Sequence, residues 1–206
     1  MLNLIGNYSL ILALITSLIL LLLSFKSYKS NSKLDFGIFV TISLQFLLIC
    51  MSFLTLLYAF ISSDFSNLAV YNNSHTTKPL FYKISGTWGN HEGSLLLWLL
   101  VLTLFIFLFI IKSKKQPTQY RILTILFQQI IIVGFFVFIL KTSSPFNYIY
   151  PVPNEGLGLN PILQDPALAI HPPLLYIGFV GSSIYFSTAL AALISKVEAR
   201  SFATSI

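Results

Sequence analysis

Five long stretches of apolar residues alternate with more polar segments along this chain. Each stretch has 18 or more residues, which at a rise of 1.5 Å per residue is enough to cross a hydrocarbon core of about 30 Å. No shift in composition divides residues 1–206, so a single membrane domain is expected. The pattern predicts an all-α, polytopic membrane protein with about five transmembrane helices, at Leu4–Phe25, Phe36–Ile61, Ser94–Ile111, Ile122–Leu140 and Pro173–Ile194.

The basic residues gather on one side of the predicted membrane. Nine of the twelve positive charges follow the first, third and fifth stretches, and only Lys78, Lys83 and Lys141 fall on the opposite side. Because the side rich in Lys and Arg is normally the inner one, the N-terminus is expected outside and the C-terminus inside. Two long outer loops, 62–93 and 141–172, then hold or border all three histidines.

The composition agrees with a membrane protein and excludes several other classes. Only 9% of the residues are charged, against about 25% in soluble domains. Topology accounts for the net charge of +6, so the lipid bilayer is expected as a partner and nucleic acid is not. The first stretch has no basic residue before it and no small-residue cleavage site after it, which predicts a retained helix and not a signal peptide. The single cysteine, Cys50, allows no internal disulfide and no cysteine-based zinc site.

The placement of polar residues directs attention to the outer loops. The predicted spans contain almost no ionisable residue, which argues against a pump or an ion-coupled transporter. No nucleophile-elbow or phosphate-loop pattern is present, so a hydrolase or a nucleotide-driven enzyme is not expected. Functional residues in such proteins tend to lie in loops held by a rigid scaffold.

The segment Asn160–Tyr176, NPILQDPALAIHPPLLY, holds the first candidate site. Proline at position 172 disfavours helical geometry at His171, so His171 is expected at a break between a short interfacial helix and the last membrane helix. Asp165 followed by Pro166 predicts the cap and the first position of that short helix.

The chemistry of His171 leaves two readings open. Neutral imidazole is a common metal ligand and the usual proximal ligand of haem iron. Asp165 or Glu155 could hold its second ring nitrogen. A histidine that only borders the lipid headgroups is equally supported by the residues alone. His75 lies in a polar run and is expected to be a solvated loop residue.

A second candidate segment runs from Trp88 to Trp98, WGNHEGSLLLW. Glu92 and Ser94 fall where a helix N-terminus is expected, since exposed N–H groups favour carboxylates and hydroxyls there. The simpler interpretation is a helix start with the two tryptophans as interfacial anchors. The alternative has His91 and Trp88 lining a pocket for a flat, apolar ligand.

Four segments together resemble a known family in order and spacing. The chain carries WGNHEGSLLLW at 88–98, TSSPF at 142–146, NPILQDP at 160–166 and HPPLLY at 171–176. This series resembles the N-terminal part of CcmF, the haem lyase subunit of the cytochrome c maturation system of many bacteria and some mitochondria. The resemblance covers nearly the whole chain.

The resemblance implies a function and a site. CcmF accepts haem from the haem chaperone CcmE. With a CcmH-type subunit it supports thioether formation between the haem vinyl groups and the C-x-x-C-H thiols of apocytochrome c. The resemblance implies that His171 is an axial ligand of the haem iron, with Trp88, His91, Asp165 and Pro172 as weaker candidates for pocket or supporting residues. No catalytic residue is implied.

Other features of the family have no counterpart in these 206 residues. They are its tryptophan-rich outer loop, its second outer-face histidine and the two membrane histidines of a resident b-type haem. The chain is therefore expected to be one piece of a split CcmF, sharing non-covalent haem with the remaining CcmF fragment and incomplete as an enzyme alone. The mitochondrial inner membrane is the expected location, with a bacterial inner membrane as the alternative. A non-catalytic structural subunit of a larger respiratory assembly is the alternative function.

Overall fold

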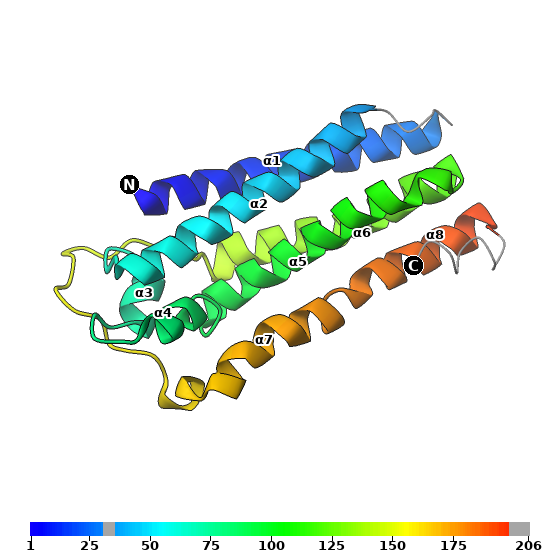
Figure 1. Cartoon of the computed structure of the whole chain (residues 1–206). Helices are drawn as coiled ribbons and strands as arrows, with labels where there is room; N and C mark the ends of the chain where they lie inside the picture. Colours follow the sequence, from blue (N-terminus) through cyan, green and yellow to red (C-terminus); the bar gives the residue numbers. More distant parts are fainter. Residues whose placement is uncertain (31–35, 198–206) are drawn as a thin grey trace.

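The computed structural model describes residues 1–30 and 36–197, where the secondary structure is helical apart from one isolated antiparallel bridge between Asn67 and Tyr148. The long helices lie side by side along one axis (Figure 1). This confirms the all-α prediction for that part of the chain. The elements are α1 (Leu2–Lys29), α2 (Phe36–Ser62), α3 (Leu68–Asn73), α4 (Leu80–Gly86), α5 (His91–Lys112), η1 (Ser113–Lys115), α6 (Thr118–Thr142), η2 (Pro161–Gln164), α7 (Pro166–Phe179) and α8 (Ser182–Ser195).

Five helical spans are long and apolar enough to cross a membrane, as predicted. They are α1, α2, α5 with η1, α6, and α7 together with α8. Large apolar side chains face outward on these spans, as contact with lipid requires, and examples are Leu22, Leu47, Leu108 and Ile130. The protein is an integral membrane protein.

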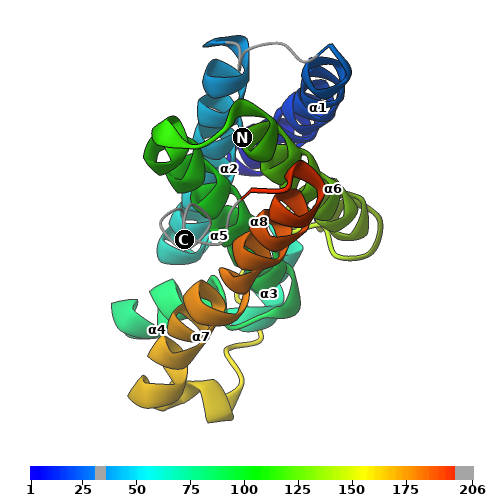
Figure 2. The same ribbon diagram turned by 90° about the vertical axis from the view of Figure 1, so that its right-hand side faces the viewer.

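The spans pack around a shared apolar core. Helix α1 lies along α2 and α6, α2 packs on α5, and α6 packs on α8 (Figure 2). Leu10, Ile42, Leu102 and Ile132 are among the fully or almost fully buried residues at these contacts. Burial of such side chains, together with close helix packing, holds the bundle together within the bilayer.

The two ends of the bundle differ in structure and charge. The first, called the loop end here, carries α3, α4 and residues 143–165, and the other, called the basic end, carries the α5–α6 connection (Figure 1). All four carboxylates of the described residues lie at the loop end: Asp64, Glu92, Glu155 and Asp165. Seven described cations lie at the basic end: Lys26, Lys29, Lys112, Lys114, Lys115, Arg121 and Lys196. The orientation of the two ends across a membrane stays a prediction.

Two adjacent glutamines of α6 join this helix to α2 and to α8 by hydrogen bonds. Gln129 and Gln45 of α2 exchange amide hydrogen bonds of 3.0 and 3.1 Å. Gln128 donates to Ser183 Oγ at 3.0 Å and accepts from Ser187 Oγ at 2.8 Å, both on α8. Both glutamine side chains are fully buried. Because unpaired amides are costly in an apolar interior, these pairs favour one register between the helices.

The prediction of a helix break at His171 is wrong. Helix α7 runs without interruption from Pro166 to Phe179 and includes both Pro172 and Pro173. The last span therefore starts seven residues before the predicted Pro173. Proline fits a helical φ, and a helix in a bilayer tolerates it where the freed carbonyls find other partners.

The chain turns instead at Val180 and Gly181, between α7 and α8. A Cβ atom on Gly181 would lie 2.2 Å from the Ile177 carbonyl oxygen and 2.6 Å from a ring atom of Phe105. The glycine is therefore required for the close approach of the α7–α8 junction to α5.

Candidate functional site

The start of α7 is built by Asp165, as the sequence predicted. Its Oδ1 accepts hydrogen bonds from the backbone N–H groups of Ala167 at 2.8 Å and Leu168 at 3.1 Å. Pro166 occupies the first helical turn, where a missing N–H costs nothing. Asp165 is therefore a helix cap, and in the described structure no hydrogen bond joins it to His171.

The proline pair frees a carbonyl that Trp88 then binds. In a regular helix the N–H of residue 173 would donate to the carbonyl of Ala169, but Pro173 has no N–H. The Trp88 indole Nε1 donates to that carbonyl at 2.8 Å instead. This bond ties the WGNHEGS segment to the HPPLLY segment and compensates for one proline in α7.

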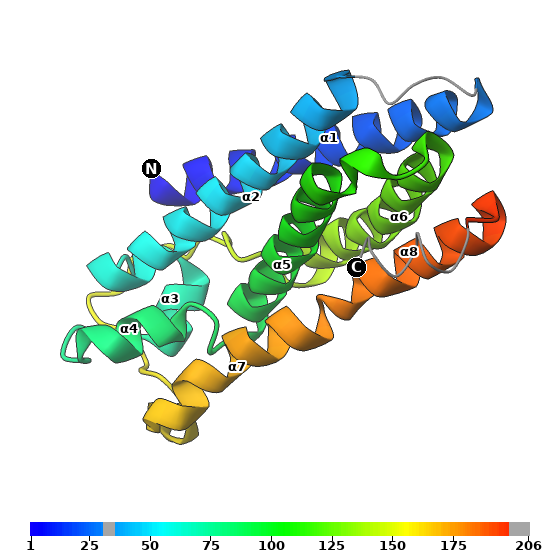
Figure 3. The same ribbon diagram turned by 45° about the vertical axis from the view of Figure 1, so that its right-hand side comes forward.

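A second contact joins the same two segments further along α5 and α7, toward the middle of the bundle. The Trp98 ring lies edge-on to Tyr176, with centroids 5.3 Å apart. It also contacts Phe179 at 6.1 Å and Phe135 of α6 at 5.5 Å. Trp88 and Trp98 therefore hold α7 at two points, one on the turn before α5 and one on the first half of α5. Figure 3 shows α7 running beside the start of α5.

His171 lies between these two attachment points, on an open face of α7. Its side chain is exposed and has no hydrogen-bond or ionic partner among residues 1–30 and 36–197. Leu168, Leu174 and Leu175, three or four residues away on the same face of the helix, are 44%, 64% and 49% exposed. A free imidazole surrounded by exposed apolar side chains suits one face of a flat, apolar ligand that carries a metal. One nitrogen donor beside apolar side chains fits haem.

Helix α5 begins at His91, three residues before the predicted span, and its cap is Asn90. The Asn90 Oδ1 accepts from Gly93 N at 2.8 Å, and its Nδ2 donates to the Gly86 carbonyl at 2.6 Å. Ser94 Oγ donates to the Trp88 carbonyl at 2.8 Å. The predicted helix start is confirmed, but the capping side chain was missed.

The structure separates the roles of the two aromatic candidates in this segment. Trp88 is half-buried with its indole turned to α7, while His91 is exposed and has no hydrogen-bond partner among the described residues. A pocket that His91 and Trp88 line together therefore stays a prediction. Pro172 is half-buried beside the exposed His171.

Glu155 makes no hydrogen bond to His171 in the described structure. It joins the two outer loops. Its carboxylate accepts from the backbone N–H of Thr76 at 2.9 Å, from the Thr76 hydroxyl and from Gly156 N at 3.0 Å. His75 Nδ1 lies 3.8 Å from the same carboxylate and 2.9 Å from the hydroxyl of Thr77. His75 is thus part of a clasp between the loops, a role that its polar neighbours in sequence did not reveal.

This clasp predicts a loop end that loosens in acid. The hydrogen bond from the Thr76 hydroxyl, helped by the Thr76 backbone, lowers the pKa of Glu155 from 4.5 to about 2. A carboxylate with a lowered pKa stabilises the folded state fully above pH 4.5 and loses that effect as the pH falls toward 2. Pepsin cleavage of residues 143–165 should therefore rise over this range in the wild type.

In Glu155→Gln the same cleavage should already be raised at pH 4.5 and should change less with further acid. Glu92→Gln, which removes a carboxylate outside the clasp, is the control and should follow the wild type. If cleavage of Glu155→Gln depended on pH as it does in the wild type, this result would contradict the clasp.

The bond from Trp88 to α7 can be tested with a double-mutant cycle. Trp88→Phe keeps an aromatic ring but leaves the Ala169 carbonyl without a donor, which should cost about 1–2 kcal/mol. Hydrogen exchange in α7, followed by mass spectrometry, should become faster. Pro173→Ala restores a backbone N–H for that carbonyl, so Trp88→Phe should cost less in this background. Equal effects of Trp88→Phe in both backgrounds would show that the indole bond does not hold α7.

Comparison with known proteins shows which family the chain resembles. Residues 88–205 match the protein family described as Cytochrome C assembly protein. The chain is 46% identical over 190 residues to the cytochrome c-type biogenesis protein CycK of Rhizobium meliloti, covering 92% of this chain and 28% of that protein. It is 44% identical over 153 residues to the cytochrome c-type biogenesis protein CcmF of Escherichia coli, covering 74% of this chain and 24% of that protein.

A solved structure of the cytochrome c haem lyase CcmF superposes on the whole chain. The TM-score is 0.81 at 28% identity, and the match covers 100% of this chain and 32% of that chain. The chain thus spans about a third or less of the length of the proteins that it matches.

Proposed function

The chain belongs to the cytochrome c assembly protein family, and we propose that it forms part of a haem lyase that attaches haem to apocytochrome c. Its similarity to CcmF and CycK over most of its length supports this role. In this proposal the membrane spans are a scaffold, and the loop end, facing the outer side of the membrane, is the working face.

His171 is the residue that carries the proposal. Its imidazole is free, lies on an open apolar face and is held in place by the contacts of Trp88 and Trp98 with α7. In the proposed role one ring nitrogen of His171 binds the haem iron, and the neighbouring leucines contact the macrocycle. The haem is the substrate and brings the two vinyl groups that form the thioether bonds. Trp88, Pro172 and Asp165 position α7, and His91 borders the site without binding iron.

The relatives are longer than the matched region, and their remainder supports a proposal about the rest of the site. We propose that the corresponding part of the lyase, on this or a separate polypeptide, supplies the second iron ligand and the other wall of the cavity. Haem would then be bound non-covalently and shared between the two parts. A CcmE-type chaperone, a CcmH-type subunit and apocytochrome c are the proposed partners, in a mitochondrial or bacterial inner membrane.

A pull-down from the native membrane tests this proposal. The tagged chain should co-purify with haem-handling subunits of cytochrome c maturation, and loss of the chain should lower holocytochrome c. Co-purification with a respiratory complex that has no haem-handling subunit, together with normal holocytochrome c after loss of the chain, would favour a structural subunit instead.

A further inference from the structure

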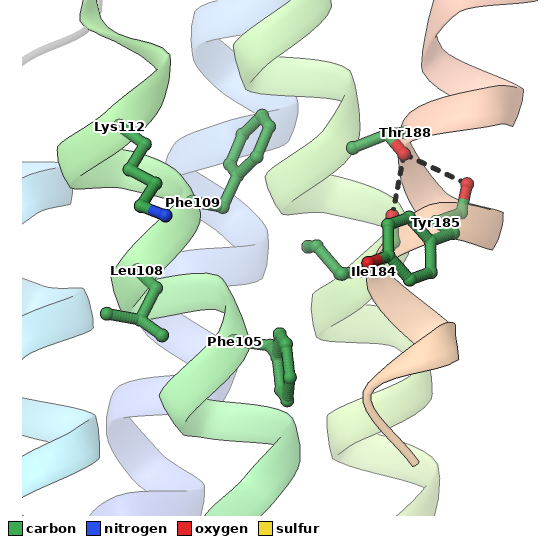
Figure 4. Close-up of a pocket in the computed structure, with 7 residues that line it drawn as sticks. All are labelled: Phe105, Leu108, Phe109, Lys112, Ile184, Tyr185 and Thr188. Carbon is green, nitrogen blue, oxygen red and sulfur yellow. Dashed lines mark hydrogen bonds between the residues drawn. The ribbon is translucent and has the colours of Figure 1, made fainter. Parts of the chain in front are cut away.

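A groove between α5 and α8 lies toward the basic end, away from the proposed haem site. It is lined by Phe105, Leu108, Phe109 and Lys112 of α5 and by Ile184 and Tyr185 of α8 (Figure 4). Its volume is about 90 Å³, well below the roughly 300 Å³ or more of a site for a drug-sized ligand. The groove is open along one side, so it can hold a linear chain but not a macrocycle.

Three side chains bring polar groups to the groove. Lys112 is exposed, and its amine has no hydrogen-bond or ionic partner in the described part of the chain. Figure 4 shows this side chain on the α5 side of the groove and the Tyr185 hydroxyl on the opposite, α8 side, next to Ile184. The Thr188 hydroxyl is already bonded to the carbonyls of Ile184 at 2.8 Å and Tyr185 at 2.9 Å. One free cation and one phenol hydroxyl therefore remain for a ligand.

The spacing of these groups along α5 suits a lipid whose acyl chain lies along the helix. Lys112 lies seven residues beyond Phe105 on α5, which is about 10 Å along the helix axis. Because Lys112 is near the end of its span, we expect its amine at the level of the headgroups, where lysine side chains reach toward water, and the aromatic part of the groove within the hydrocarbon region.

The charge around the groove favours an anion. In the full sequence, nine of the twelve cations and two of the six carboxylates, Asp35 and Glu198, follow the first, third and fifth spans, so this side has an excess of seven positive charges. Basic groups between membrane helices on such a side are typical of sites for anionic lipid headgroups.

We propose that this groove binds an anionic phospholipid, with one acyl chain along Phe105, Leu108 and Ile184 and the phosphate on Lys112. The lipid fills the space between α5 and α8 and steadies α8 against the bundle. This site is independent of the proposed haem chemistry.

Native mass spectrometry of the full chain in detergent tests the proposal. The probes are phosphatidylglycerol and phosphatidylcholine with identical acyl chains. The wild type should retain phosphatidylglycerol in preference. Lys112→Gln should lower that retention about fivefold, the effect of losing one cation near the membrane surface. Lys114→Gln removes the same charge at the same end outside the groove and should change retention little.

A second variant tests the apolar part of the site. Leu108→Trp fills the groove from a position that is already exposed, so it should fold and should lower retention of the lipid without changing the charge. If Lys112→Gln and Lys114→Gln lowered retention of phosphatidylglycerol equally, the proposal would be overturned, because the lipid would then be attracted to the overall charge of the basic end and not to this groove. Equal retention of both lipids, or no effect of Leu108→Trp, would also overturn it.

Discussion

Replacing His171 with alanine is expected to abolish haem attachment while leaving the protein folded in the membrane. Loss of a residue that merely supports an iron ligand lowers metal affinity or activity by about 10–100-fold. Loss of the ligand itself should therefore lower holocytochrome c by about 100-fold or more. The fold should persist because the His171 side chain is exposed and has no partner among the described residues.

Two comparisons separate a ligand from a structural residue at position 171. Ile177→Ala shortens an exposed side chain of α7 that is not among the leucines proposed to contact the macrocycle, and it should retain most of the activity. Added imidazole should restore part of the activity of His171→Ala, because it can occupy the vacated ligand position. Normal holocytochrome c in His171→Ala would exclude His171 as an essential ligand. The amount of His171→Ala protein in the membrane would be measured as well, so that loss of the protein can be told apart from loss of its activity.

The apolar runs were sufficient to predict the five spans, because a bilayer leaves the backbone few alternatives to helix. Local signals also predicted the cap at Asp165 and a helix start near His91. They failed at His171, where the rule for residues before proline predicts a break. The compensating donor is the Trp88 indole, 81 residues before the carbonyl that it binds. No local pattern contains that information.

The same limit applies to the polar residues. Gln45 and Gln129 are 84 positions apart, and Glu155 binds Thr76 from a distance of 79 positions. Each looked isolated in the sequence, because its partner is set by how the helices and loops pack. The candidate iron ligand could be named from its residue type and motif. Its open apolar setting, and the contacts of Trp88 and Trp98 that hold α7, depend on tertiary structure.

Gly93→Ala is expected to damage the site from within α5. A Cβ atom on Gly93 would lie 1.6 Å from the Thr87 carbonyl oxygen and 2.8 Å from the Thr87 carbonyl carbon. These are backbone atoms, so no side-chain rotation relieves the overlap. The turn that carries Trp88 must move, and this movement weakens the indole bond to Ala169. We expect a loss of about 3 kcal/mol in the free energy of unfolding.

Gly134→Ala is the matched control, because a Cβ at Gly134 on α6 would meet no atom within 4 Å. That variant should be neutral, or more stable by up to about 1 kcal/mol from the better helix propensity of alanine. Thermal unfolding in detergent should therefore separate the two alanine variants, and hydrogen exchange in α7 should be faster only in Gly93→Ala. Similar behaviour of the two variants would mean that the start of α5 accommodates a methyl group.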